Sequence, residues 1–202
     1  ASFGITTIQE GMLVDEMLPL YQLLLNARIL KLDLAVYPDK ETLAAAEQQI
    51  GMYGTGYHSH VRIGGIKIFL DGSPQGRTAW MTEPYQGDED YRGYGTMTDM
   101  EVLDALREAG KRKVQIIAHC NGDAAAEQFL NCLETAEQEY PVLRTLRPVI
   151  IHGQFMRPDQ MLKARDLGAV VSFFTAHTWY WGDVHVQNFG LERASRISAA
   201  AS

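Results

Sequence analysis

The sequence has little of what marks several common classes of protein. It contains only two cysteines, Cys120 and Cys132, which fit a reducing compartment such as the cytoplasm better than a disulfide framework. Its longest apolar runs, such as AVVSFF, fall far short of the roughly 20 residues that span a bilayer. No basic segment followed by an apolar one opens the chain, so we see no signal peptide. The net charge of -7, without a Lys/Arg cluster, argues against a nucleic-acid surface.

What the sequence does contain is a repeated alternation of apolar, β-rich runs with helical patterns. The expected strands are 4–10, 27–37, 64–72, 113–123, 147–154 and 168–177. The expected helices are 15–26, 39–54, 98–112, 123–140 and 157–168. Continuous rather than alternating apolar strands predict a parallel sheet covered by helices. A doubly wound sheet and a (β/α)₈ barrel both fit, and no G-x-G-x-x-G or P-loop motif favours a nucleotide-binding sheet.

Four of the expected strands end in residues that can do chemistry. Lys67 and Asp71 lie on the third strand, and His119, His152 and His177 end the next three. The long segment 72–98, rich in Gly, Pro, Tyr and Asp, follows the third strand, where a barrel carries functional loops. In a barrel the carboxyl ends of the strands meet at one mouth, so we expect these side chains to converge.

Each of these side chains also has a structural interpretation. A single histidine at a strand end can be a buried ring bonded to backbone, but three at equivalent positions favour a metal role for His119 and His152. For His177 we expect substrate contact or proton transfer. An unpaired buried ammonium is costly, so Lys67 either pairs with a carboxylate such as Asp71 or has reacted with carbon dioxide to form a carbamate.

Three other candidates lie outside this group. The H-x-H pair His58 and His60 precedes a strand, so we expect it at the opposite end of the barrel, on the surface. Asp123 begins a helix, where a carboxylate suits the backbone N–H groups, and it could also bond a ligand histidine from outside the metal shell.

The segments GGIKIFLDGS, IIAHCNGDAA, RPVIIHGQ, LGAVVSFFTAHTWYWGD and FGLERASRIS together resemble the amidohydrolase superfamily. The branch they resemble most is amidohydrolase family 3, the YtcJ-like hydrolases, which include N-substituted formamide deformylases. This resemblance implies a (β/α)₈ barrel and a metal-dependent hydrolase of carbon–nitrogen bonds in small amide-like molecules. It implies that Lys67 is carboxylated and bridges two divalent ions, expected to be zinc, with His119 and His152 as further ligands.

The resemblance also implies which parts to expect elsewhere in the family. An H-x-H on strand one, an aspartate on strand eight and a small β-sandwich complete such enzymes, and none is found here, so residues 1–202 are interpreted as barrel strands two to seven. His177, Trp179, Tyr180 and Trp181 would line the substrate pocket, with Asp71 at a commonly acidic position. The alternatives are a non-catalytic fragment that forms homo-oligomers through open sheet edges, or a mononuclear deaminase-type barrel. Such a fragment could also bind no metal on its own.

Overall fold

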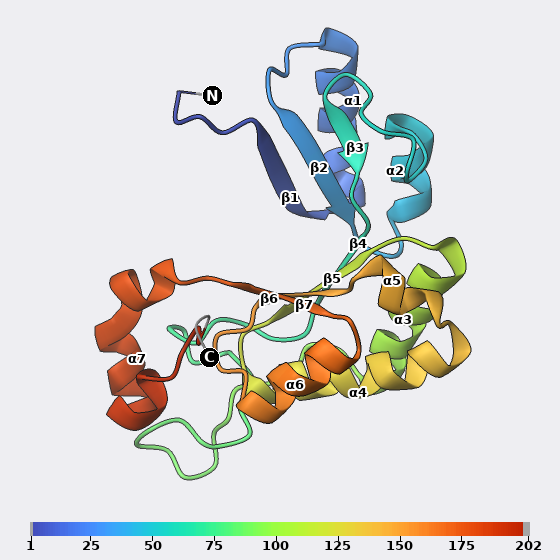
Figure 1. Ribbon diagram of the computed structural model, residues 1–202. Helices are drawn as coiled ribbons and strands as arrows, with labels where there is room; N and C mark the ends of the chain where they lie inside the picture. The colour runs from blue at the N-terminus through green and yellow to red at the C-terminus, as the bar shows by residue number, and fades with distance from the viewer. Residues whose placement is uncertain (1, 200–202) are drawn as a thin grey trace.

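The computed structural model describes residues 2–199 and contains a series of parallel strands with helices between them (Figure 1). The strands are β1 (Thr7–Leu13), β2 (Asp33–Pro38), β3 (Val61–Ile63), β4 (Ile66–Phe69), β5 (Ile116–Cys120), β6 (Val149–His152) and β7 (Val170–Phe173). The helices are α1 (Leu18–Ala27), α2 (Leu43–Ile50), α3 (Asp99–Arg112), α4 (Asp123–Glu139), α5 (Val142–Leu146), α6 (Pro158–Asp166) and α7 (Ala176–Ala194), and a 3₁₀ turn, η1, covers Asp15–Met17.

The strands form two parallel sheets, in the orders β1-β2-β3 and β4-β5-β6-β7. The expected third strand, 64–72, is present as β4, which is shorter at both ends. β3 was not predicted, and only Gly64 and Gly65 separate it from β4. Gly65 has a φ of +151°, and a Cβ there would lie 2.1 Å from the Gln115 carbonyl oxygen, so the close approach of β4 to β5 requires glycine. All six expected strands and the predicted parallel arrangement are confirmed.

Local sequence signals explain where several helices begin. Thr98 and Glu101 form a capping box at the start of α3, in which the backbone N–H of Thr98 donates to a Glu101 carboxylate oxygen at 2.7 Å. Pro158 occupies the first position of α6, where its missing N–H costs nothing. Pro19 is likewise tolerated in the first turn of α1.

The two faces of the sheets have different environments. Side chains such as Val36, Ile116 and Ile150 lie under the helices in the main core. Their sequence neighbours Tyr37 and Ile117 point to the opposite face, where a smaller cluster links the two sheets. Because side chains alternate along a strand, this second face is the inner surface of a barrel.

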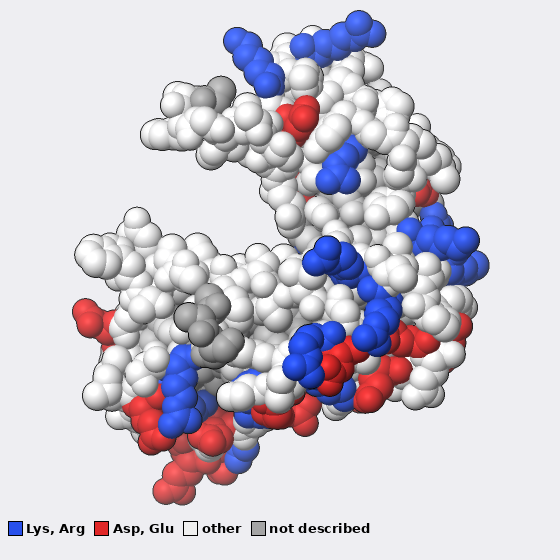
Figure 2. Space-filling model, in the orientation of Figure 1, with Lys and Arg blue, Asp and Glu red and all other residues white. Residues whose placement is uncertain are grey.

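The barrel is open on one side. Within the described residues, β1 and β7 each have a single strand neighbour, and so do β3 and β4, which follow one another along the chain where the two sheets meet. The edges of β1 and β7 are therefore the outer edges of the two sheets taken together. Figure 2 shows a wide hollow between the part that holds β1–β3 and the part that holds β4–β7 and α7, with few charged side chains on its walls. These features agree with a partial (β/α)₈ barrel. Within residues 2–199, no helix has both the length and the apolarity needed to cross a membrane.

The last expected strand ends earlier than the sequence predicted. β7 stops at Phe173, and the N–H of His177 donates to the Phe174 carbonyl oxygen at 3.1 Å as the chain turns into α7. His177 therefore lies in the first turn of a helix, and its assignment to a strand end was wrong. The helix was missed because aromatic and β-branched residues in HTWYWGDVHV resemble a strand or loop in composition.

Candidate metal site at the barrel mouth

Lys67 lies in the middle of β4 with its side chain on the inner face of the sheet. The residue is 3% exposed, and its Nζ atom lies 4.6 Å from the centre of the Phe69 ring. Burial lowers the pKa of Lys67 to about 8, and no carboxylate among the described residues counteracts it, so the ion pair with Asp71 does not form. A buried amine of this kind has a larger neutral fraction at neutral pH than an exposed lysine.

His119 lies on the neighbouring strand β5, directly opposite Phe69 in the parallel register. Its ring stacks on the Phe69 ring with the two centroids 4.4 Å apart. The Nε2 atom lies 3.1 Å from the Gly72 carbonyl oxygen and 2.9 Å from the Asn121 amide nitrogen. Burial, with a smaller effect from Lys67, lowers the pKa of His119 to about 4, so the ring is neutral at pH 7. These hydrogen bonds engage Nε2 and leave Nδ1 as the nitrogen that can bind a metal.

His152 ends β6, and it reaches the same place in an unusual way. In the register it pairs with Cys120, on the helix-facing side, yet its φ of +78° turns the side chain out of the strand pattern. The His152 and His119 rings consequently meet edge to face with centroids 4.7 Å apart. Burial is the main cause that lowers the pKa of His152 to about 4. A left-handed backbone at a non-glycine residue is often found where function requires a particular geometry.

Asp71 lies next to His119 and holds the surrounding backbone in place. Its carboxylate accepts hydrogen bonds from the backbone N–H groups of Trp80 (3.1 Å), Asn121 (2.9 Å) and Gly122 (2.7 Å), which tie the loop after β4 to the end of β5. Burial raises the pKa of Asp71 to about 7 in spite of these bonds. The side chain is fully buried, and its contact with substrate stays a prediction.

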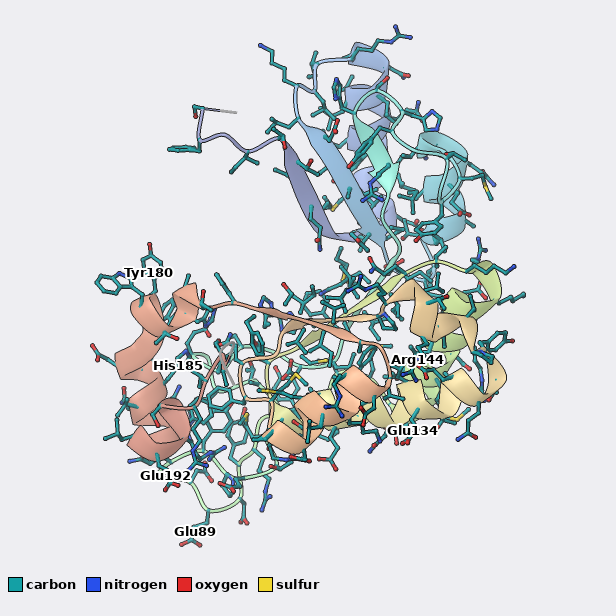
Figure 3. The ribbon with its side chains drawn as sticks, viewed as in Figure 1. Glu89, Glu134, Arg144, Tyr180, His185 and Glu192 are labelled. Carbon is teal, nitrogen blue, oxygen red and sulfur yellow. The ribbon has the colours of Figure 1, made fainter. Side chains whose placement is uncertain are left out.

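His177 packs beside this group without joining it. Its ring lies 4.6 Å from the Phe174 ring and 5.7 Å from that of His185, centroid to centroid, and Phe174 in turn contacts His152. His185 is fully buried on the side of α7 that faces the rest of the molecule (Figure 3). Among the described residues, Nδ1 of His177 and both ring nitrogens of His185 lack a hydrogen-bond partner.

The aromatic residues that follow His177 lie on the exposed side of α7. Trp179 is 86% exposed and Trp181 41%, and Tyr180 projects away from the body of the molecule (Figure 3). Neither tryptophan lines either of the two pockets described below, so their contact with substrate stays a prediction.

Asp123 and the H-x-H pair lie apart from the histidines at the barrel mouth. The Asp123 carboxylate accepts from the backbone N–H of Thr82 at 2.9 Å and from Arg157 at 3.2 Å, and no side-chain cap of α4 forms. The expected bond from Asp123 to a ligand histidine is therefore absent from the described structure. His60 pairs with Asp33, which begins β2, and so the H-x-H motif lies at the amino ends of the strands.

Two pockets lie near the carboxyl ends of the strands. The smaller, of about 420 Å³, reaches Lys67 and Phe69 and is bordered by Lys40, Glu41 and Glu101. The larger, of about 630 Å³, lies between the loop after β4, the start of α6 and the end of α7. Lys67 is thus among the residues that line the smaller pocket.

The group Lys67, His119 and His152 can supply part of a metal site. Neutral imidazoles are good ligands for zinc and similar ions, and a carboxylated lysine would add oxygen ligands. Residues 2–199 contain no cluster of three or more His, Cys, Asp or Glu side chains arranged to hold a metal ion. The described donors are thus compatible with a metal ion but form an incomplete ligand set. Sequence reasoning overlooked Phe69, Asn121 and His185, although Asn121 follows His119 by two residues.

Comparison of the sequence and the fold with known proteins identifies the family of this chain. The sequence model described as "Amidohydrolase family" matches residues 1–201. The putative amidohydrolase YtcJ of Bacillus subtilis is 33% identical over 105 residues, which cover 52% of this chain and 19% of that protein. Protein LONG AFTER FAR-RED 3 of Arabidopsis thaliana is 27% identical over 136 residues, covering 67% of this chain and 23% of that protein.

Two solved structures agree with the fold. An uncharacterized metal-dependent hydrolase from Pyrococcus furiosus superposes with a TM-score of 0.78 and 25% identity, over 96% of this chain and 39% of that one. A second, from Pyrococcus horikoshii, gives 0.74 and 24%, over 93% of this chain and 36% of that one. The chain therefore spans less than half of each relative. Because the family pattern extends over nearly its whole sequence, this chain belongs to the amidohydrolase family.

Proposed function

We propose that this chain carries part of the active site of a metal-dependent hydrolase that cleaves carbon–nitrogen bonds in small amide-like molecules. The observation that supports this most is the meeting of Lys67, His119 and His152 from three adjacent strands. The similarity to the metal-dependent hydrolase from Pyrococcus furiosus supports a reaction of the same class. We propose zinc as the ion, since imidazole nitrogen and carboxylate oxygen both suit it.

The Lys67 amine is the group that we propose to be carboxylated. With a pKa of about 8, roughly a tenth of the amine is neutral at pH 7. The nitrogen lone pair attacks the carbon of carbon dioxide and an N–C bond forms. One C=O π bond breaks, with its electron pair moving to oxygen, and one proton passes from the nitrogen to solvent water. The product is a carbamate with a single negative charge, which replaces a buried cation by an anion next to two neutral imidazoles.

The bound ions would supply a hydroxide-like water at neutral pH and polarise the substrate carbonyl. The residues of this chain then have separate tasks. His119 and His152 hold their rings neutral because burial lowers their pKa values, so no imidazolium has to lose its charge before the rings can bind an ion. Phe69 keeps water from one side of the Lys67 side chain. We propose that His177 contacts the substrate and that Trp179 and Trp181 bind its apolar part.

Carboxylation and metal binding can be tested on the chain itself. ¹³C-labelled bicarbonate should give a carbamate signal in the ¹³C spectrum that is lost in Lys67→Ala and kept in Lys40→Ala, which removes an exposed amine from the same pocket. Zinc binding, measured by calorimetry, should weaken in His119→Asn and His152→Asn but not in His58→Asn. A carbamate signal that survives Lys67→Ala would argue against the assignment, as would zinc binding unaffected by both histidine variants.

Hydrolysis is tested with a panel of N-substituted amides and formamides, following release of the amine after zinc and bicarbonate are added. One bound ion and no carbamate would instead favour the mononuclear deaminase-type barrel. The free edges of β1 and β7 favour a different second candidate, a non-catalytic chain that self-associates. A stable dimer that binds no zinc, seen by analytical ultracentrifugation with metal analysis, would support that candidate.

A further inference from the structure

A buried side-chain amide, that of Asn121, lies between the ends of β4, β5 and β6. The residue is 2% exposed and follows β5 directly. Its Nδ2 atom donates to the Gly72 carbonyl oxygen at 2.7 Å, and its Oδ1 atom accepts from Nε2 of Gln154 at 2.8 Å. Gln154 is itself 1% exposed. One amide therefore connects the loops that follow three adjacent strands.

The orientation of this amide is determined by its neighbours. A backbone carbonyl can only accept a hydrogen bond, so the NH₂ group, and not the oxygen, must face Gly72. The Oδ1 atom then faces the Gln154 amide nitrogen, which can donate to it. The Gly72 contact therefore fixes the orientation of the Asn121 amide, and the Gln154 contact agrees with it.

The second hydrogen of the Asn121 amide is directed at His119. The Asn121 Nδ2 atom lies 2.9 Å from Nε2 of His119, while the Gly72 carbonyl oxygen lies 3.1 Å from the same nitrogen. The nearest Asp71 carboxylate oxygen, at 3.6 Å, is beyond hydrogen-bond distance. If Nε2 carried a proton, two N–H groups would face each other and one buried donor would have no acceptor. If Nε2 is unprotonated, it accepts from Asn121, and Gly72 keeps its bond from the other amide hydrogen. Leaving a buried donor unpaired is the more costly arrangement.

We propose that Asn121 is a positioning residue for His119, which fixes the ring in place and holds Nε2 as a hydrogen-bond acceptor in the metal-free chain. The proton of the neutral ring then lies on Nδ1. The functional consequence rests on the function proposed above. Nδ1 can bind an ion only after the ring changes to the tautomer with its proton on Nε2, whose N–H then donates a hydrogen bond to the Gly72 carbonyl oxygen. Asn121 thereby sets how readily His119 becomes a ligand.

The tautomer of His119 in the metal-free chain tests this directly. ¹⁵N spectra of the labelled imidazole at neutral pH should show an unprotonated Nε2 in the wild type. In Asn121→Ala, Nε2 should become protonated and donate to Gly72, a change in the tautomer ratio of roughly tenfold or more, as expected when one buried hydrogen bond decides it.

Asn188→Ala is the matched control. Asn188 is also a buried asparagine, and its amide donates to the carbonyl oxygens of Pro74 and Gln75. Among the described residues it forms no hydrogen bond with a histidine ring. Its removal should leave the His119 tautomer unchanged. The proposal is overturned if Nε2 is protonated in the wild type, or if Asn121→Ala keeps the wild-type tautomer. Should Asn121→Ala not fold, the wild-type spectrum alone decides. None of these spectra involves metal, so their outcome is separate from that of the zinc and carbamate experiments.

Discussion

Replacing Asp71 by asparagine should change how the free energy of unfolding depends on pH. Burial raises the pKa of the Asp71 carboxyl from 3.8 to about 7, although three backbone N–H groups bond to it. The folded chain therefore binds a proton at Asp71 more tightly than the unfolded chain does. The resulting contribution to stability is fully present below about pH 4 and is lost as the pH rises toward 7.

The size of the effect follows from the shift in pKa. A difference of about three pH units corresponds to about 4 kcal/mol, at about 1.4 kcal/mol for each unit. An asparagine side chain at this position cannot ionise, so Asp71→Asn should gain up to about 4 kcal/mol relative to the wild type between about pH 4 and pH 7. Against this gain, the Asn121 backbone N–H loses its acceptor, which costs about 1–3 kcal/mol at every pH. The difference between the two proteins should therefore change with pH, and its sign can reverse near neutrality.

The assay is urea unfolding of both proteins at a series of pH values, followed by tryptophan fluorescence and circular dichroism. Asp90→Asn, which removes one exposed carboxyl from the same loop, controls for the change in net charge. A difference between wild type and Asp71→Asn that stays constant from pH 4 to pH 7 would refute the reasoning. It would mean that the backbone bonds fully offset the burial of the charge.

Three further predictions concern neighbouring residues. In buffer free of bicarbonate and metal, where Lys67 is an unmodified amine, Lys67→Met should raise the free energy of unfolding by up to about 3 kcal/mol at pH 7. The reason is that the lowered pKa of about 8 penalises the folded ammonium below that pH. Urea unfolding should show the gain vanish toward pH 10, and a gain independent of pH would contradict the prediction. Gly122→Ala should destabilise the chain by about 3 kcal/mol or more in a thermal melt, since the new Cβ would lie 1.8 Å from the Trp80 carbonyl oxygen. An unchanged melting temperature would contradict this and show that the Trp80 loop can move away. His152→Asn should change the free energy of unfolding by no more than about 1 kcal/mol, because asparagine tolerates the left-handed backbone. Its zinc affinity, measured by calorimetry, should fall at least tenfold. A large loss of stability would mean that the His152 ring itself stabilises the end of the strand.

Much of the fold could be predicted from the sequence because its signals are local. Parallel strands buried on both faces have continuous apolar runs, and the capping residues Thr98 and Glu101 mark the start of α3 without reference to the rest of the chain. The end of β7 could not be predicted in this way. Phe174 has strong strand propensity, yet the chain turns into α7 immediately after it. α7 packs against Phe155 through His185 and Phe189, a long-range contact that no local pattern predicts.

The same distinction between local signals and long-range contacts applies to the candidate site. Lys67 and His119 could be placed on the inner face because alternate residues of a strand share a face. His152 could not, since the register puts it on the opposite face and only its left-handed backbone returns the ring toward His119. The contacts of Asn121 with Gly72 and Gln154 join loops far apart in the sequence, and no local pattern predicts them.

The most direct test of the account is a zinc titration of the chain, in the presence of bicarbonate, followed by the imidazole resonances of its six histidines. The account predicts that the signals of His119 and His152 change together at the lowest zinc concentrations, and that the change is lost in Lys67→Ala. The signals of His58 and His60, at the opposite end of the strands, should stay in place over the same range. Zinc that first shifts His58 and His60, or that shifts His119 and His152 equally well without Lys67, would contradict the central claim.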